Sequence, residues 1–85
     1  MITKQDIEEF GFTTMYELFD FIISDHLRGE KIVTTSFIEG MSVPQLVDFV
    51  HYCKQEETVP HGFIVKKAIK DCLRIANNKM RKEIK

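Results

Sequence analysis

The chain has 85 residues, which is enough for one domain with one hydrophobic core but not for two. Its apolar residues make up 44% of the chain, yet no apolar run exceeds three residues, far short of the roughly 20 that a membrane-spanning helix needs. Two cysteines are too few for a disulfide framework, and the first residues are polar and acidic rather than a signal peptide. We therefore expect a soluble, cytoplasmic protein of a single domain, residues 1–85, with reduced thiols.

Charge is unevenly divided along the chain. Residues 1–57 carry eleven acidic side chains against four basic ones, a net charge of −7. Residues 58–85 carry eight basic side chains against two acidic ones, a net charge of +6. Such a division of charge indicates which partners the protein could attract, and it says little about the fold. It predicts a cationic surface in the C-terminal third.

Two helix starts are marked in the first third of the sequence. Thr3 and Asp6 match the Thr-x-x-acid pattern of a capping box, and Gly11 is placed to end the short helix that follows. Thr14 and Glu17 repeat the capping pattern at the start of a helix that we expect to run to about residue 28. This second helix has an acidic back and one apolar stripe, formed by Met15, Leu18, Phe19, Ile22, Ile23 and Leu27.

The next stretch is ambiguous. Residues 31–35 are rich in β-branched side chains, which favour extended backbone. Residues 36–39 read Ser-Phe-Ile-Glu, which again matches a capping box, so we expect an extended connector and then one helical turn ended by Gly40. The chain contains no second strand-like run, so a strand here would have to pair across a dimer.

The last two helices are the most clearly marked. Ser42 and Gln45 form a third capping pattern, with Pro44 in the first turn, where its missing N–H has no partner to lose. That helix should run to about Glu56, and residues 58–62 should interrupt the chain before a long final helix begins at about Phe63. On a helical wheel the final helix has an apolar arc of Val65, Ile69, Cys72, Leu73, Ala76 and Met80, which Lys79 and Glu83 interrupt. Its opposite half is basic, with Lys66, Lys67, Lys70, Arg74, Arg81, Lys82 and Lys85.

These elements predict an all-α fold, a compact bundle of four to five helices with one extended connector around residues 31–35. The helices at residues 14–28, 42–56 and 63–83 should form the core, and the short N-terminal helix should cover one end. A core of this size is small, and a homodimer is one way to enlarge it.

The basic half of the final helix is the candidate partner-binding site, and we assign it to Lys66, Lys67, Lys70, Arg74, Arg81 and Lys82. Two structural explanations compete with a functional one: these cations form a solvated helix face, or they pair with the acidic back of the helix at residues 14–28. As a functional surface, the face and nearby Phe residues should bind an acidic protein or a second copy of this chain. Nucleic acid is the alternative, and an anionic membrane surface is the third choice. A helix-turn-helix is not indicated, because the break before the final helix is about six residues long and contains a proline.

No residues form a recognisable catalytic or metal-binding pattern. His51 and Cys53 are two apart, which on a helix directs them to different sides. Cys53 and Cys72 lie on apolar stripes and should be buried as small hydrophobic residues. We expect His26 to pair with carbonyls at a helix end and His61 to be exposed in a turn. The prediction is a non-enzymatic protein with no catalytic residues, no cofactor and no metal.

Two segments in particular carry a resemblance that extends over the whole chain. They are residues 6–12, Asp-Ile-Glu-Glu-Phe-Gly-Phe, and residues 42–50, Ser-Val-Pro-Gln-Leu-Val-Asp-Phe-Val. The chain resembles the cytoplasmic lysis-inhibition accessory proteins (co-antiholins) of T-even phages. This resemblance implies a soluble regulatory protein that binds the cytoplasmic part of a membrane holin and delays lysis. It carries no site residues over to this chain.

Overall fold

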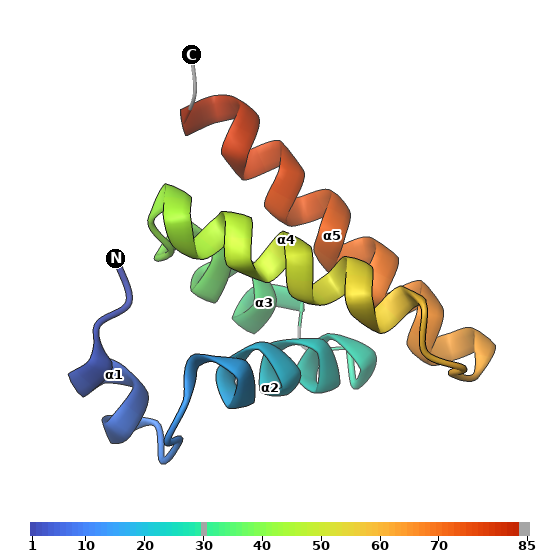
Figure 1. Ribbon diagram of the computed structural model, residues 1–85, viewed down its shortest axis with the longest axis horizontal. Coiled ribbons are helices and arrows are strands. Elements are labelled where there is room, and N and C mark those ends of the chain that lie inside the picture. Colours follow the sequence, from blue (N-terminus) through green and yellow to red (C-terminus); the bar gives the residue numbers. More distant parts are fainter. Residues whose placement is uncertain (30, 84–85) are drawn as a thin grey trace.

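The fold is a bundle of helices, as the computed structural model shows for the residues that it describes, 1–29 and 31–83 (Figure 1). In chain order the helices are α1 (Lys4–Glu9), α2 (Met15–Leu27), α3 (Lys31–Glu39), α4 (Val43–Glu57) and α5 (Phe63–Glu83). The described residues contain no strand, so the predicted all-α class and helix number are confirmed. Within these ranges no helix combines the length and the apolar character that crossing a membrane requires.

Complete capping boxes start α1 and α4, as predicted. At α1 the Thr3 hydroxyl accepts from the Asp6 N–H at 3.1 Å, and the Asp6 carboxylate accepts from the Thr3 N–H at 2.8 Å. At α4 the Ser42 hydroxyl accepts from the Gln45 N–H at 3.4 Å, and Gln45 Oε1 accepts from the Ser42 N–H at 3.0 Å. Each box satisfies two N–H groups that a helix start would otherwise leave without a partner.

The cap of α2 is only half of the box that we expected. The Thr14 hydroxyl accepts from the Glu17 N–H at 3.3 Å, but the Glu17 carboxylate accepts from the Thr13 hydroxyl instead of closing the box. The predicted ends of α1 and α2 are confirmed, because Gly11 and Gly29 follow them at φ values of +89° and +94°. Side chains other than glycine rarely adopt this left-handed backbone.

Helix α3 corrects our expectation of an extended connector over residues 31–35. The backbone is helical from Lys31 to Glu39, so residues 36–39 are the end of this helix and not the start of a new turn. Thr34 and Ile38, one turn apart, are 0% and 1% exposed, and their burial in the bundle outweighs the modest extended preference of β-branched residues. The Thr35 hydroxyl donates to the Lys31 carbonyl at 3.0 Å, a bond along the helix axis. The proposed pairing of a strand across a dimer is therefore withdrawn.

The two longest helices, α4 and α5, lie antiparallel and make the most extensive contact in the bundle (Figure 1). Helix α5 also packs on α2 and α3, which contact each other, while α1 lies at one end beside the start of α2. The centre of the core is an edge-on contact between the rings of Phe19 and Phe49, whose centroids are 5.0 Å apart. The other large side chains that are fully buried around them are Leu18, Ile22, Ile38, Leu46, Ile69, Thr34, Cys53 and Cys72.

Gln45 ties the N-terminal segment to the start of α4. In addition to its capping bond, its Oε1 accepts from the Ile2 N–H at 3.1 Å and its amide donates to the Ile2 carbonyl. Ile2 is 8% exposed and belongs to the core cluster, so these bonds hold a buried residue in place.

Replacing Gln45 with alanine should lower the free energy of unfolding by about 1–2 kcal/mol, because half of the cap and both bonds to Ile2 are lost. Urea denaturation followed by circular dichroism measures the change. Gln55→Ala is the matched control, since Gln55 is exposed on the same helix. Equal midpoints for the two variants would contradict this role for Gln45.

Candidate functional site

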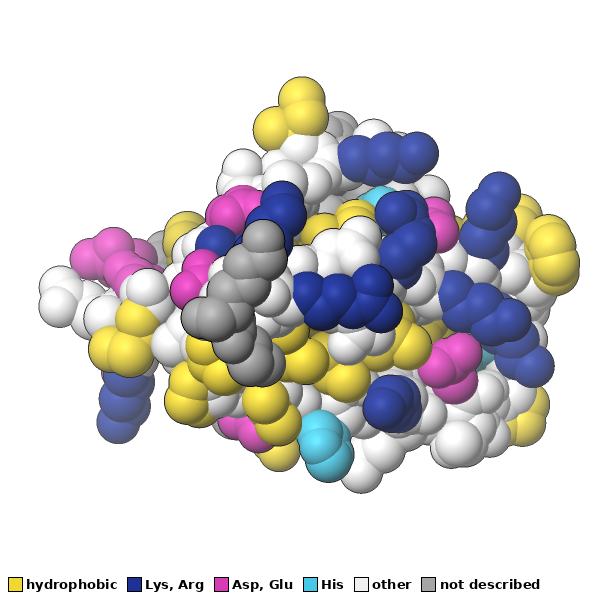
Figure 2. Space-filling model, turned by 90° about the horizontal axis from the view of Figure 1, so that it is seen from above, with side chains coloured by type: hydrophobic (Ala, Val, Ile, Leu, Met, Phe, Trp, Pro, Cys, Tyr) yellow, Lys and Arg dark blue, Asp and Glu magenta, His cyan; other side chains and the backbone are white. Residues whose placement is uncertain are grey.

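The basic face, which we define as Lys66, Lys67, Lys70, Arg74, Arg81 and Lys82, is exposed over its whole length. The repeat of 3.6 residues per turn places these positions away from the buried side of α5, which is formed by Ala68, Ile69, Cys72 and Ala76. From Lys66 to Lys82 the face extends about 24 Å along the helix axis. Figure 2 shows Lys and Arg side chains, in dark blue, spread over the side of the molecule that is seen from above. Lys85, which we also placed on this half, lies outside the described residues.

The cations of this face are largely unpaired within the described part of the molecule. Arg74 forms the one ion pair, with Asp71 on the same helix at 3.8 Å, and the Arg74 side chain is still 65% exposed. The other five form no ion pair with a described carboxylate. The expected alternative, in which the basic face pairs with the acidic back of α2, is therefore not found among the described residues.

Lys79 shows how a cation of α5 is neutralised when it faces the bundle. Its Nζ lies 2.7 Å from Glu83 Oε1 and 3.0 Å from Glu39 Oε2 of α3. The hydrogen bond to Glu83, and then the one to Glu39, raise the pKa of Lys79, and the bond to Lys79 lowers the pKa of Glu83. The two residues that interrupt the apolar arc in the sequence thus pair with each other, and Lys79 also pairs with α3. The basic face has no comparable partners among the described carboxylates.

A shallow hollow gives the basic face a specific shape. It measures about 450 Å³ and is lined by Lys70, Arg74 and Arg81 together with Leu73, Asn77 and Asn78. Guanidinium and amide groups donate hydrogen bonds in fixed directions, and Arg can hold a carboxylate through two parallel bonds. The hollow is therefore suited to carboxylates or other anionic groups carried on a larger partner.

Apolar side chains stand beside the start of the basic face. Phe63 is 82% exposed and Ile64 is 70% exposed, although a helix start carrying these residues would ordinarily be covered. Both residues precede the buried residues of α5, the first of which is Ala68. Phe63 precedes Lys66, the first cation of the basic face, by three residues.

His26 forms a buried side-chain network that the sequence did not indicate. Its Nδ1 lies 3.2 Å from Thr34 Oγ1, and its Nε2 lies 3.4 Å from Asp71 Oδ2. The expectation that His26 pairs with carbonyls is wrong, because the neighbouring helices α3 and α5 supply side-chain partners. The Thr34 hydroxyl is fully buried, so this network joins three helices rather than presenting a nucleophile to a substrate.

The remaining candidate residues have structural surroundings. His61 is less exposed than expected, since its side chain is 26% exposed and its Nε2 lies 2.9 Å from Glu56 Oε2. Cys53 and Cys72 are free thiols and are both 0% exposed, which confirms their predicted burial. In the described ranges no three His, Cys, Asp or Glu side chains gather closely enough to hold a metal ion.

Burial of the two thiols should make the protein less stable at alkaline pH. Burial raises the pKa of Cys72 to about 12. Burial also raises the pKa of Cys53, and the neighbouring Cys72 adds a smaller increase. Unfolded thiols titrate near about pH 8.5, so above this pH the unfolded chain has released protons that the folded chain keeps. The free energy of unfolding should then fall by up to about 1.4 kcal/mol per pH unit for each thiol.

Urea midpoints measured at pH 7 and pH 9.5 test this expectation. In Cys72→Ala, which has one buried thiol left, the free energy of unfolding should fall about half as steeply with pH. An equal midpoint at the two pH values would contradict it.

The site as a whole is a basic helix face with a hollow of anion-binding character and two exposed apolar residues at its start. Exposed charges of one sign favour association with a partner of the opposite sign, so the chemistry of this surface suits an anionic partner. Comparison with protein families, with curated proteins and with solved structures finds no match for this chain.

Proposed function

We propose that this chain is a small non-enzymatic regulatory protein that acts by binding another protein through the basic face of α5. The observation that carries the proposal is that five of the six cations on this face form no ion pair with a described carboxylate, whereas the inward-facing Lys79 has two. A patch of one sign of charge speeds association with a partner of opposite sign and disfavours partners of the same sign.

The partner should present carboxylates to the hollow between Lys70, Arg74 and Arg81. The resemblance to the co-antiholins of T-even phages indicates which protein this partner is. On that basis the partner is the cytoplasmic segment of a membrane holin, the protein works in the cytoplasm, and its binding delays lysis.

The test is a binding titration of the full chain with the cytoplasmic segment of a T-even holin as a soluble peptide, at about 50 and 200 mM salt. The expected result is a saturable 1:1 complex whose dissociation constant rises at the higher salt, because screening weakens contacts between exposed charges. Absence of binding at the lower salt would overturn the holin assignment. Binding that does not respond to salt would overturn the role of the basic face.

Nucleic acid is the alternative partner, since phosphates would meet the same cations. The start of α5 favours a protein instead, because it exposes Phe63 and Ile64 where a DNA-reading helix carries polar side chains that reach base edges. A mobility shift with duplex DNA separates the two: six phosphate contacts predict a fall in affinity of about 10³-fold between 50 and 200 mM salt. Such a shift, without binding of the holin peptide, would replace the protein partner by nucleic acid.

A further inference from the structure

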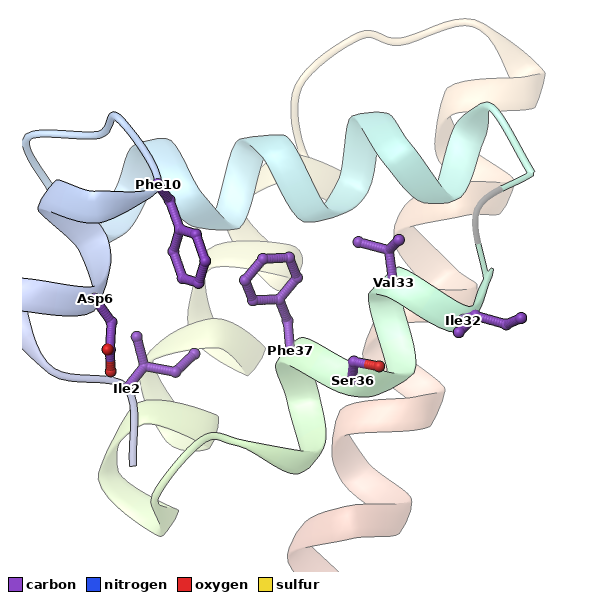
Figure 3. A pocket seen from close by; sticks show the side chains of 7 residues that line it. All are labelled: Ile2, Asp6, Phe10, Ile32, Val33, Ser36 and Phe37. Atoms are coloured by element: carbon purple, nitrogen blue, oxygen red, sulfur yellow. The ribbon is translucent and has the colours of Figure 1, made fainter.

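An apolar groove lies between the N-terminal segment and α3. Helix α1, on one side of it, is at the opposite end of the molecule from the start of α5 (Figure 1). It has a volume of about 390 Å³, and its apolar wall is formed by Ile2, Phe10, Ile32, Val33 and Phe37. Figure 3 shows Phe10 and Phe37 directed toward each other across one end of the groove, with Val33 and Ile32 further along α3. Phe10 is 50% exposed and Ile32 is 83% exposed, so this wall is open to an incoming side chain.

The polar edge of the groove is acidic on the α1 side. Asp6 lines the groove, and its hydrogen bonds with the backbone and side chain of Thr3 lower the pKa of its carboxyl group, so that it is charged at neutral pH. Glu8 and Glu9 of the same helix are exposed. A second hollow of about 270 Å³ adjoins the groove along α3, where Ile32 and Ser36 line both and Lys31 is its one cation.

The start of α5 has the complementary character. Phe63 and Ile64 are two of the most exposed large apolar residues in the described chain, and Val59, four residues before Phe63, is 44% exposed. Lys66 and Lys67 follow within one helical turn and are exposed. We define the tip as Phe63, Ile64, Lys66 and Lys67. It offers two adjacent apolar side chains with a cation pair behind them, against an apolar groove that the carboxylate of Asp6 lines.

We infer that the tip of one copy of this chain docks in the α1–α3 groove of a second copy. Helix α1, which forms one wall of the groove, and the start of α5 lie at opposite ends of the molecule, so the contact forms between molecules (Figure 1). Phe63 enters the groove, Ile64 covers Ile32 at the adjoining hollow, and the two lysines face the side of α1 that carries Asp6. Because two different surfaces meet, the contact is heterologous: in a pair, one copy keeps its groove free and the other keeps its tip free, unless the assembly closes on itself.

A mixing experiment tests this inference. One variant removes the tip, Phe63→Ser with Ile64→Ser, and a second blocks the groove with a charge, Ile32→Asp. All three positions are at least 70% exposed, so both variants should fold, which circular dichroism checks. Sedimentation velocity over a concentration series should show self-association of the unchanged chain and single chains of 10.0 kDa for each variant alone. An equal mixture of the two should form a dimer and nothing larger, because only one intact tip and one intact groove remain in the pair.

Three outcomes would overturn the inference. The first is an unchanged chain that stays monomeric up to about 1 mM. The second is a mixture that stays monomeric while the unchanged chain associates, which would mean that like surfaces meet. The third is self-association of either variant alone. Ile32→Ser serves as a second groove variant and should weaken association about tenfold or more.

A further variant separates this inference from the proposed function. Lys70→Glu with Arg74→Glu and Arg81→Glu changes the basic face but leaves the tip intact. It should associate with itself as the unchanged chain does, while its affinity for the holin peptide falls. Loss of self-association in this variant would place the contact on the basic face and overturn the assignment to the tip.

Discussion

Phe49→Ala should destabilise the fold by about 3–5 kcal/mol, the largest loss that we expect from a single substitution. Phe49 is 0% exposed and its ring meets that of Phe19 at the centre of the bundle, where α4 crosses α2. Removing the ring takes away its apolar burial and leaves a cavity that the surrounding helices can fill only in part. A domain of this size has about 5 kcal/mol of stability to lose, so a large fraction of the variant should be unfolded at 37 °C.

Phe63→Ala is the matched control, because it removes the same ring from a position that is 82% exposed. Its effect on the urea midpoint should correspond to less than about 0.5 kcal/mol. A loss below about 1 kcal/mol in Phe49→Ala would contradict the central position of that ring.

Charge reversal in the hollow should reduce affinity for the holin peptide about 100-fold. The variant is Lys70→Glu, Arg74→Glu and Arg81→Glu, which places three like charges against the carboxylates of the partner, and like-charge contacts cost several kcal/mol. Much of the loss should appear in the association rate, which exposed charges govern through steering. Stopped-flow binding at low salt measures that rate.

The matched control reverses three exposed lysines elsewhere in the chain, at Lys4, Lys31 and Lys54. It changes the net charge of the protein by the same amount but leaves the basic face intact. Its affinity should fall far less than that of the hollow variant. Equal losses in the two variants would mean that net charge, and not the surface of α5, attracts the partner.

The parts of the fold that local patterns determine could be predicted from the sequence. Ser42, Pro44 and Gln45 marked the start of α4, and the 3.6-residue repeat of α5 separated its buried side from its basic face. A cap depends on four consecutive residues and a helix face on one continuous stretch. Both can be recognised without knowing what lies nearby in space.

The parts that depend on distant neighbours could not be predicted. Local preference favoured extended backbone at residues 31–35, and only burial of Thr34 and Ile38 against other helices makes α3. His26 contacts Asp71, which is 45 positions further along the sequence, and no spacing rule connects the two. The same holds for the groove, whose walls come from residues 2–10 and 32–37.

Nuclear magnetic resonance with a ¹⁵N-labelled chain tests most directly the central claim, that the basic face of α5 is open to a partner. Titration with the holin peptide at low salt should shift the amide signals around Lys70, Arg74 and Arg81, and about 200 mM salt should reduce these shifts. Signals from the surface that α2 and α4 share, near Tyr16 and Val47, should stay in place. Shifts confined to that surface, with the α5 signals unmoved, would contradict the account.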